Sequence, residues 1–250
     1  AARRPSGPVP ESLVLDGFES FEFSHFHPTR YHVLAGQGAH FFYGFTDTEL
    51  RRSGRMTRRQ RQRRGELERL HGRPDPRSSE SEVIELFRVV LPQPQALVLH
   101  SDQHPDYPRA LDQLPHLKVV HRTLSSRAAR TPMNPLFPIN LLDLLIRHCG
   151  ANHKRETIAF SKRRQSAIER LWVLLVWRNY LKSVSERRRD GSPAMRLGLC
   201  ERRWTAAELL AWRGFPARVD LPARWARYYW RQVPTRLIPR AATHRARYAF

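Results

Sequence analysis

The alternation of hydrophobic and polar positions predicts three short strands near the beginning of the chain. Ser12 to Asp16 has the pattern of a short buried strand. Tyr31 to Ala35 and Ala39 to Phe45 have the pattern of two more strands, joined by a turn at Gly36-Gln37-Gly38. Consecutive strands with such short connections pair in an antiparallel manner. This part of the chain therefore predicts a three-strand antiparallel meander.

Helices and strands alternate in the next part of the chain. Thr57 to Leu70 has a helical composition dominated by arginine, and Glu80 to Val90 carries the apolar stripe of an amphipathic helix. Ala96 to His100 and Leu117 to His121 are predicted strands, with a short helix over Pro105 to Leu114 between them. The order is β-β-β-α-β-α-β, with a further helix after it, which predicts an α/β domain.

The rest of the chain is predicted to be helical. Ile139 to Arg147 forms one helix, and a segment from about Lys154 to Glu186 forms a long one that is apolar on more than one face. Four of the six tryptophans follow the break at Gly191, Ser192 and Pro193, and we interpret them as core residues. We expect a basic tail (1–11), a main domain (12–190) with an arginine-rich insertion (50–76), and a C-terminal extension rich in Trp and Arg (191–250).

The charge balance indicates that the predicted α/β domain binds a polyanion. The chain has 250 residues, 44 Lys and Arg against 23 Asp and Glu, and a formal net charge of +21. Only four of the basic residues are lysines. Because guanidinium groups bind phosphate oxygens in a bidentate manner, a phosphate polymer is the expected partner. Net charge alone does not separate an enzyme acting on DNA from a passive binder.

The lack of a membrane-spanning run and of a signal-peptide pattern predicts the compartment of the protein. The longest apolar run, Leu171 to Trp177, is far shorter than the ~20 residues of a membrane span, and the first residues of the sequence show no signal-peptide pattern. Cys149 and Cys200 form no C-x-x-C pair, which argues against a disulfide framework and a cysteine zinc site. We expect a soluble cytoplasmic protein with no membrane partner.

Two predicted strands end in an acidic residue, and these two acids are the candidate catalytic residues of this chain. Asp16 ends Leu13-Val14-Leu15-Asp16, and Asp102 follows Leu97-Val98-Leu99-His100-Ser101. An acid that ends a hydrophobic strand is held rigidly at the edge of the sheet, and two such acids can share divalent metal. In two-metal phosphoryl transfer, one ion activates the attacking oxygen and the other stabilises the leaving oxygen. The alternative for either acid alone is an ordinary strand-ending turn.

Four segments carry a resemblance to a known family. They are DGFESFEFSHFHP, ALVLHSDQHPDY, NPLFPINLLDLLIRH and NHKRETIAFSKRRQSAIERLWVLLVWRNYLK. In combination they resemble the catalytic region of bacterial insertion-sequence transposases of the DDE superfamily, over residues 12–199. The resemblance implies an RNase H-like α/β fold. In it, a mixed sheet of an antiparallel meander plus parallel strands is flanked by helices, and the first and fourth strands are neighbours. After this region, the tryptophans of the C-terminal segment predict a small helical, Trp-rich appendage. The resemblance also implies that Asp16 and Asp102 are the first two ligands of two Mg²⁺ or Mn²⁺ ions.

The third metal ligand departs from the common pattern of that superfamily. Asn140 stands at the expected distance beyond Asp102, and related families carry Glu or Asn there. An amide oxygen is an acceptable ligand for a hard cation. Asp143 lies one helical turn later and is the next candidate, although Arg147 could simply pair with it. Glu169 and then Glu156 on the long predicted helix follow.

Basic residues in two segments are candidates for DNA contacts. The density of arginine between Arg51 and Arg64 favours a grip on the DNA backbone over an inert surface run, with binding that falls steeply with salt. The resemblance implies further backbone contacts at the start of the long helix, for which the alternative is a solvated cationic face. The candidates are Arg51, Arg52, Arg55, Arg58, Arg59, Arg61, Arg63, Arg64, Lys154, Arg155, Lys162, Arg163 and Arg164.

The sequence thus predicts a bacterial DNA transposase that cleaves and joins strands at insertion-sequence ends, in the cytoplasm and associated with the nucleoid. Its expected partners are double-stranded DNA, as element ends and as target, and further copies of itself, and no small-molecule cofactor is expected. The rival hypothesis is an inactive DNA-binding protein that keeps the fold and the basic surface. A structure-selective nuclease of the same fold, which cleaves without joining, is a third. His100, His104 and His121 are interpreted as structural, with phosphate binding as the alternative.

Overall fold

A five-stranded mixed sheet forms the centre of the computed structural model, which describes residues 7–125, 127–153, 161–211 and 220–234. The strand order is β3-β2-β1-β4-β5, with β1–β2 and β2–β3 antiparallel and β1–β4 and β4–β5 parallel. The strands are β1 (Leu13–Glu22), β2 (Ser24–Gly36), β3 (Phe42–Glu49), β4 (Gln95–Ser101) and β5 (Leu117–Thr123). The predicted meander is confirmed, and so is the adjacency of the first and fourth strands.

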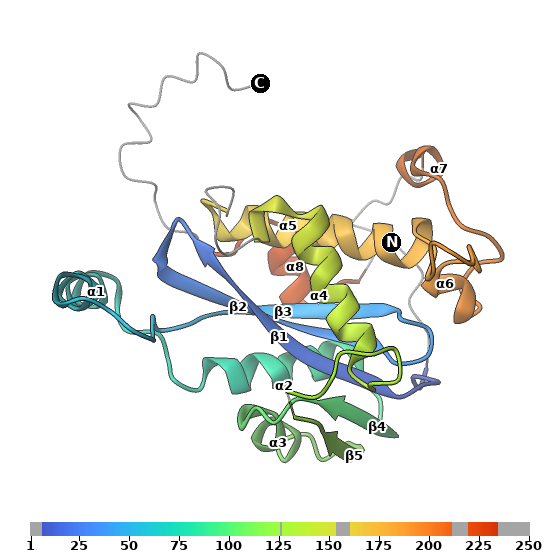
Figure 1. Ribbon diagram of the computed structural model, residues 1–250, viewed down its shortest axis with the longest axis horizontal. Helices are drawn as coiled ribbons and strands as arrows, with labels where there is room; N and C mark the ends of the chain where they lie inside the picture. The colour runs from blue at the N-terminus through green and yellow to red at the C-terminus, as the bar shows by residue number, and fades with distance from the viewer. Residues whose placement is uncertain (1–6, 126, 154–160, 212–219, 235–250) are drawn as a thin grey trace.

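Helices cover both faces of this sheet (Figure 1). The α-helices are α1 (Arg58–His71), α2 (Ser78–Val90), α3 (Asp106–Leu111), α4 (Phe137–Cys149), α5 (Arg164–Val176), α6 (Pro193–Arg196), α7 (Ala206–Ala211) and α8 (Ala223–Tyr229). A 3₁₀ turn η1 (Ala151–His153) follows α4, and a π-helical turn η2 (Trp177–Leu181) continues α5. No helix in the described part of the chain has both the length and the apolar composition of a membrane span. The architecture is an α/β fold compatible with the RNase H-like class.

The alternation of side chains along β1 divides the core into two layers. Leu13 and Leu15 point to one face, where the apolar stripe of α2 packs with α3. Val14 and Phe18 point to the other face, where α4, α5 and α8 pack. A strand places successive side chains on opposite faces, so Asp16 belongs to the face of Val14 and Phe18. That face is covered by α4 (Figure 1).

The first strand is longer than predicted. β1 continues past Asp16 to Glu22, turns at Phe23, whose φ is 61°, and pairs with β2 along its length. Gly17 therefore lies within a strand rather than in a turn, and Asp16 does not end β1. The hairpin persists because alternate residues, Phe18 among them, remain buried while the backbone hydrogen bonds are satisfied by β2.

The long predicted helix is shorter than expected. Its helical part begins at Arg164 and ends at Leu181, because Arg163 and Lys182 both have extended backbone conformations. Residues 154–160, at the start of the prediction, lie outside the described residues.

The tryptophans of the C-terminal segment were predicted to be core residues. Trp225 is buried in the layer under α5, and Trp204 stacks on Tyr180 with ring centroids 4.5 Å apart. Trp230, however, is 60% exposed, so the prediction is wrong for this residue. Trp212 lies outside the described residues. The segment is thus part of the core through α8.

Candidate active site

Two acids lie side by side at the centre of the sheet. The parallel pairing of β1 with β4 joins Leu13 to Leu99, Val14 to His100 and Leu15 to Ser101. Asp16 is the next residue of β1, and Asp102 is the first residue after the end of β4. The negative charge of Asp102 contributes to the raised pKa of Asp16, so the two carboxylates lie near each other. The sequence prediction that the sheet brings these two acids together agrees with this register.

Each of the two carboxylates is held by a backbone N–H group. The Gly17 N–H donates to Oδ1 of Asp16 at 2.6 Å, and the His104 N–H donates to Oδ1 of Asp102 at 3.0 Å. Both contacts use Oδ1 only, and within the described residues no hydrogen bond reaches Oδ2 of either acid. Each side chain is therefore oriented while one of its oxygen atoms is left for a ligand.

Burial and like charge perturb Asp16. The pKa of its carboxyl is raised from 3.8 to about 6, chiefly by burial, with smaller contributions from the Asp102 and Asp143 carboxylates. The Gly17 hydrogen bond and the Arg130 guanidinium act in the opposite direction. Three carboxylates thus share one electrostatic environment within a strongly cationic chain. A bound divalent cation would relieve their mutual repulsion.

The third carboxylate comes from α4. Asn140 and Asp143 occupy successive turns of this helix, whose buried residues Ile139, Leu142 and Ile146 fix its orientation on the sheet. Both oxygen atoms of Asp143 accept from Nε of Arg147, at 3.0 and 3.2 Å. The expected pairing of these two residues is therefore present, and the charge of Asp143 nevertheless reaches Asp16.

The donor set fits a hard divalent cation. Asp16 and Asp102 offer carboxylate oxygens, and α4 adds either an amide or a carboxylate oxygen. Among the residues that the structure describes, no three His, Cys, Asp or Glu side chains lie close enough together to form a complete metal cage. Mg²⁺ does not require one, because it is commonly bound by one or two carboxylates together with water and substrate phosphates. Two acids side by side are sufficient for that mode of binding.

Arg30 supports the segment that carries Asp102. Its Nη2 donates to Glu19 at 2.8 Å, and its Nη1 contacts Nε2 of His104 at 2.9 Å. Burial and the Arg30 charge lower the pKa of His104, so the ring is neutral and Nε2 accepts from Arg30. A Cβ atom at Gly17 would lie 3.1 Å from Cδ of Arg30, so the glycine leaves room for this side chain. Arg30 is thus a positioning residue, which the sequence analysis missed.

The remaining histidines near Asp102 are buried or bonded inside the protein. His100 is 5% exposed, and Nε2 of His121 lies 2.8 Å from the Ser101 hydroxyl. Burial lowers the pKa of both rings, which are therefore neutral near pH 7. Their environment agrees with the structural interpretation.

Glu169 does not join the two acids. Its Oε1 lies 2.8 Å from Nε of Arg231 and accepts from the Gln165 amide at 3.2 Å. The same amide donates to the Tyr228 carbonyl, so this group belongs to the contact between α5 and α8. Glu156, the other acid proposed on this helix, lies outside the described residues.

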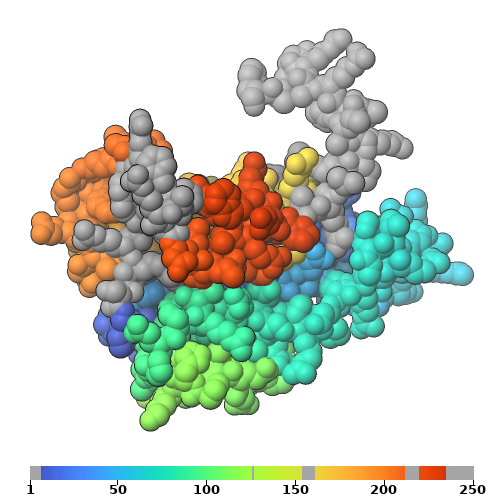
Figure 2. All heavy atoms as spheres, turned by 180° about the vertical axis from the view of Figure 1, so that it is seen from behind, coloured from blue at the N-terminus to red at the C-terminus, as the bar shows by residue number. Residues whose placement is uncertain are grey.

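The arginine-rich insertion forms a lobe at the edge of the molecule (Figures 1 and 2). Its helix α1 begins with a capping box between Thr57 and Gln60 and has no buried residue. Arg51 and Arg64 pair with Glu68, and Arg63 pairs with Glu66. Arg52 and Arg61 donate to the backbone carbonyls of His25 and Met56. Arg55, Arg58 and Arg59 are exposed and form no ion pair within the described residues.

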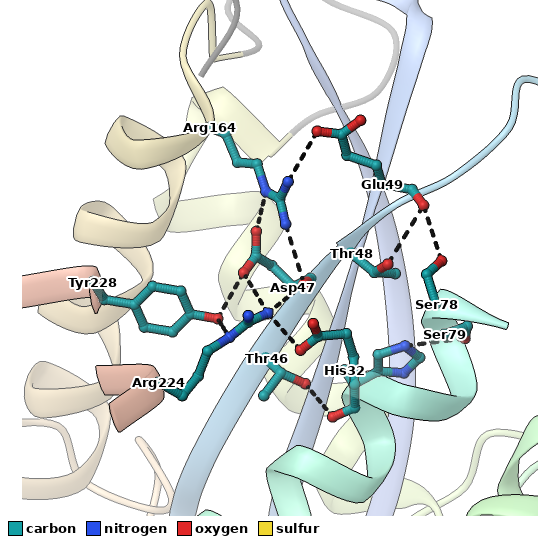
Figure 3. Close-up of polar contacts among 11 residues, drawn as sticks. His32, Thr46, Asp47, Thr48, Glu49, Ser78, Ser79, Arg164, Arg224 and Tyr228 are labelled. Atoms are coloured by element: carbon teal, nitrogen blue, oxygen red, sulfur yellow. Dashed lines mark hydrogen bonds and ion pairs between the residues drawn. The ribbon is translucent and has the colours of Figure 1, made fainter. Parts of the chain in front are cut away.

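The basic residues predicted at the start of the long helix differ in their surroundings. Lys162 and Arg163 are exposed, and Lys154 and Arg155 lie outside the described residues. Arg164 is not a surface residue, because its guanidinium pairs with the fully buried Asp47 and with Glu49 (Figure 3). The sequence suggested a DNA contact for Arg164, whereas its position is that of an internal ion pair.

Asp47 connects four elements through that network. On β3, its carboxylate accepts from Tyr228 of α8 at 2.6 Å and pairs with Arg164 of α5, and Arg224 of α8 bridges it to Glu82 of α2 (Figure 3). Burial and the Asp47 charge raise the pKa of Glu82 to about 7, although Arg224 opposes the shift. The network fixes α5 and α8 on the sheet and is distinct from the Asp16 site.

The sheet order defines an α/β protein whose fold is compatible with the RNase H-like class. No protein-family model matches the chain, and no curated protein matches it. Among solved structures, it is similar to a chain in the cryo-EM structure of the simian T-cell lymphotropic virus intasome in complex with PP2A regulatory subunit B56 gamma. The identity is 15%, the TM-score is 0.31, and the match covers 74% of this chain and 56% of that chain. The similarity is distant, and it spans little more than half of the matched chain.

Proposed function

We propose that this protein is a metal-dependent polynucleotidyl transferase that cleaves DNA strands and joins them at the ends of an insertion sequence. The observation that carries the proposal is that Asp16 on β1 lies beside the end of the parallel strand β4, which Asp102 follows, and that the Asp102 charge contributes to the raised pKa of Asp16. The cationic character of the chain and the exposed arginines of α1 support DNA as the substrate. The resemblance to DDE transposases supports strand transfer as the reaction.

In the proposed reaction, Asp16 and Asp102 would hold two Mg²⁺ or Mn²⁺ ions. When bound, the ions would supply Lewis-acid stabilisation of the attacking and the leaving oxygen of a phosphodiester. Water or a 3′-hydroxyl attacks phosphorus in line and loses its proton to solvent, one P–O bond forms, and the bond to the leaving 3′-oxygen breaks as that oxygen takes up a proton from solvent. The chain contributes binding and orientation. Arg30 and His104 fix the Asp102 segment, and the backbone N–H groups fix the two carboxylates.

The third ligand belongs to this proposal as well. Asn140 has the spacing that the resemblance implies, whereas the Asp143 carboxylate is among the charges that raise the pKa of Asp16. We take Asp143 as the stronger candidate, because a carboxylate binds a hard cation more strongly than a neutral amide does. When the cation binds, the ion pair between Arg147 and Asp143 would then open, or Asp143 would contact Arg147 and the cation together.

The proposal is tested with a supercoiled plasmid that carries the element ends, incubated with the protein and Mg²⁺ or Mn²⁺. The parent protein should nick and join this DNA only when metal is present, and Asp16→Asn should abolish both reactions. Asp112→Asn, an exposed acid at the end of α3, is the matched control and should react as the parent does. Equal activity of Asp16→Asn and the parent would refute the proposal.

One observation favours a second candidate function, an inactive DNA-binding protein of the same fold. The described residues contain no complete three-ligand metal group, and an asparagine stands at the third position. Such a protein would bind DNA without metal, and Asp102→Ala would leave its affinity unchanged. Salt-sensitive binding without cleavage by the parent protein would favour this candidate.

A further inference from the structure

An open groove lies between α1 and the tip of the β1–β2 hairpin. It has a volume of about 600 Å³ and is lined by His25, Phe26, Arg59, Gln60, Gln62, Arg63 and Glu66. This volume is within the range of roughly 300–1,000 Å³ that small-ligand pockets occupy. The arginines were predicted to contact DNA, but the aromatic wall of the groove was not predicted. It brings together aromatic rings, amides and guanidinium groups.

The aromatic wall consists of two neighbouring side chains. The rings of His25 and Phe26 have centroids 4.4 Å apart and are tilted by 34° to each other, and the Arg52 guanidinium lies 5.0 Å from the centroid of Phe26. His25 is exposed, whereas Phe26 is half-buried. Burial and the Arg52 charge lower the pKa of His25, so its ring is neutral near pH 7. His25, the outer of the two rings, therefore presents an uncharged aromatic surface to the solvent.

The opposite wall comes from α1. Arg63 is paired with Glu66 at 3.0 Å, whereas Arg59 is exposed and forms no ion pair within the described residues. Gln62 is also exposed and offers an amide that can both donate and accept hydrogen bonds. The groove thus combines a ring for stacking, an amide for hydrogen bonding and a cation for phosphate. Proteins that bind unpaired nucleic-acid strands use this combination.

We propose that this groove binds an unpaired nucleotide of the DNA substrate, with the base stacked on His25 and the adjacent phosphate on Arg59. A base inside a duplex cannot stack on a protein side chain, so the groove selects single-stranded or opened DNA. The inference rests on the proposed function only in taking DNA as the partner. The six residue steps along β1 from Asp16 to Glu22 span roughly 20 Å, so the groove lies about six nucleotide steps from the two acids.

The test is metal-free binding of a short DNA single strand that contains 2-aminopurine, a base whose fluorescence is quenched when it stacks. The parent protein should quench this base and bind the strand more tightly than the matched duplex. His25→Ala should lose the quenching and weaken single-strand binding by roughly 5- to 100-fold, the effect of one base–aromatic stack. Its salt dependence should not change, because the lost ring is uncharged. His25→Phe should restore both the quenching and the affinity.

Two matched variants separate stacking from charge. Arg59→Gln should lower the slope of log affinity against log salt by about 0.7, the value for one phosphate contact with a single strand, while quenching persists. Arg187→Gln removes an exposed arginine on another segment and should change the slope less. Tyr229→Ala removes a half-exposed aromatic ring on α8 and should change neither the affinity nor the quenching.

The outcome is independent of catalysis. Normal quenching by His25→Ala, or equal affinity of the parent for single strand and duplex, would overturn the groove inference even if the plasmid is cleaved. His25-dependent quenching without any metal-dependent cleavage would support the groove and refute the proposed enzymatic function.

Discussion

Asp16 is an acid whose ionisation costs free energy in the metal-free protein, because burial and two neighbouring carboxylates disfavour its charge. Its folded pKa of about 6 lies above the ordinary 3.8. A raised acid pKa favours the folded state fully below pH 4, and this contribution is lost as the pH rises through about 6. At pH 8 the ionised carboxyl is therefore a net cost of at most about 3 kcal/mol.

Asp16→Asn should raise the free energy of unfolding of the metal-free protein at pH 8 by up to about 3 kcal/mol, because the amide carries no charge. Denaturant unfolding at pH 4 and pH 8 measures this difference, which should be much smaller at pH 4. Added Mg²⁺ should stabilise the parent but not the variant, since only the parent keeps both carboxylates. A variant that is less stable than the parent at pH 8 would contradict the assigned environment of Asp16.

Substitution of single side chains distinguishes between Asn140 and Asp143 as the third metal ligand. If Asp143 is the third ligand, Asp143→Asn should lower the rate of metal-dependent nicking by roughly 10³-fold, a loss typical of groups that act as one catalytic unit. Asn140→Ala should retain activity within about tenfold of the parent. The rates are compared at saturating Mn²⁺. The reverse ranking would assign the role to Asn140.

The two strand acids could be predicted from the sequence, because each directly follows a hydrophobic run and a sheet brings such runs together. Arg30 could not be found in this way. The contact of Arg30 with His104 joins β2 to the segment after β4. This contact depends on the register of the β1–β2 hairpin and on the room that Gly17 leaves for the Arg30 side chain. Arg164 was misinterpreted for a related reason, since nothing in the local sequence indicates that it points inward to Asp47.

Among the elements, the strands and the amphipathic helices were predicted well because their hydrophobic period is strong. The period of β1 continued past Asp16, but the polar residues of DGFESFEFSHFHP concealed a hairpin that is buried at alternate positions. The ends of α5 are set by single extended residues, Arg163 and Lys182, which hydrophobic periodicity does not reveal. The groove beside α1 arises from a tertiary contact, so no sequence pattern could show it.

The docking of α8 depends on the buried Asp47 network, which makes a direct prediction about stability. Tyr228→Phe removes the hydrogen bond to Asp47 Oδ1, and should lower the free energy of unfolding by about 1–3 kcal/mol because a buried acceptor loses a donor. The urea midpoint should fall with an unchanged slope. Tyr229→Phe on the same helix is the control, since this side chain is 52% exposed and should tolerate the change. Equal effects of the two substitutions would contradict the role of the network.

In the molecule as a whole, the two candidate acids and the arginine-rich insertion lie apart. Asp16 lies on the central strand β1, with Asp102 just after β4, whereas α1 forms a lobe at one end of the molecule (Figure 1). This separation fits the proposed function, in which the DNA backbone binds at the periphery and the reacting phosphate meets the acids. Assembly of two copies on two DNA ends remains an expectation of the resemblance to transposases.

Asp16 and Asp102 are proposed to act as a single metal-binding unit, and a double-mutant cycle tests this claim most directly. Nicking of supercoiled plasmid DNA is measured for the parent, Asp16→Asn, Asp102→Ala and the double variant, across a titration of Mn²⁺. Each single variant should lose roughly 10³-fold or more of the metal-dependent rate, and the double variant should lose no more than either one. Losses that multiply, or nicking that survives Asp102→Ala, would contradict a shared metal site.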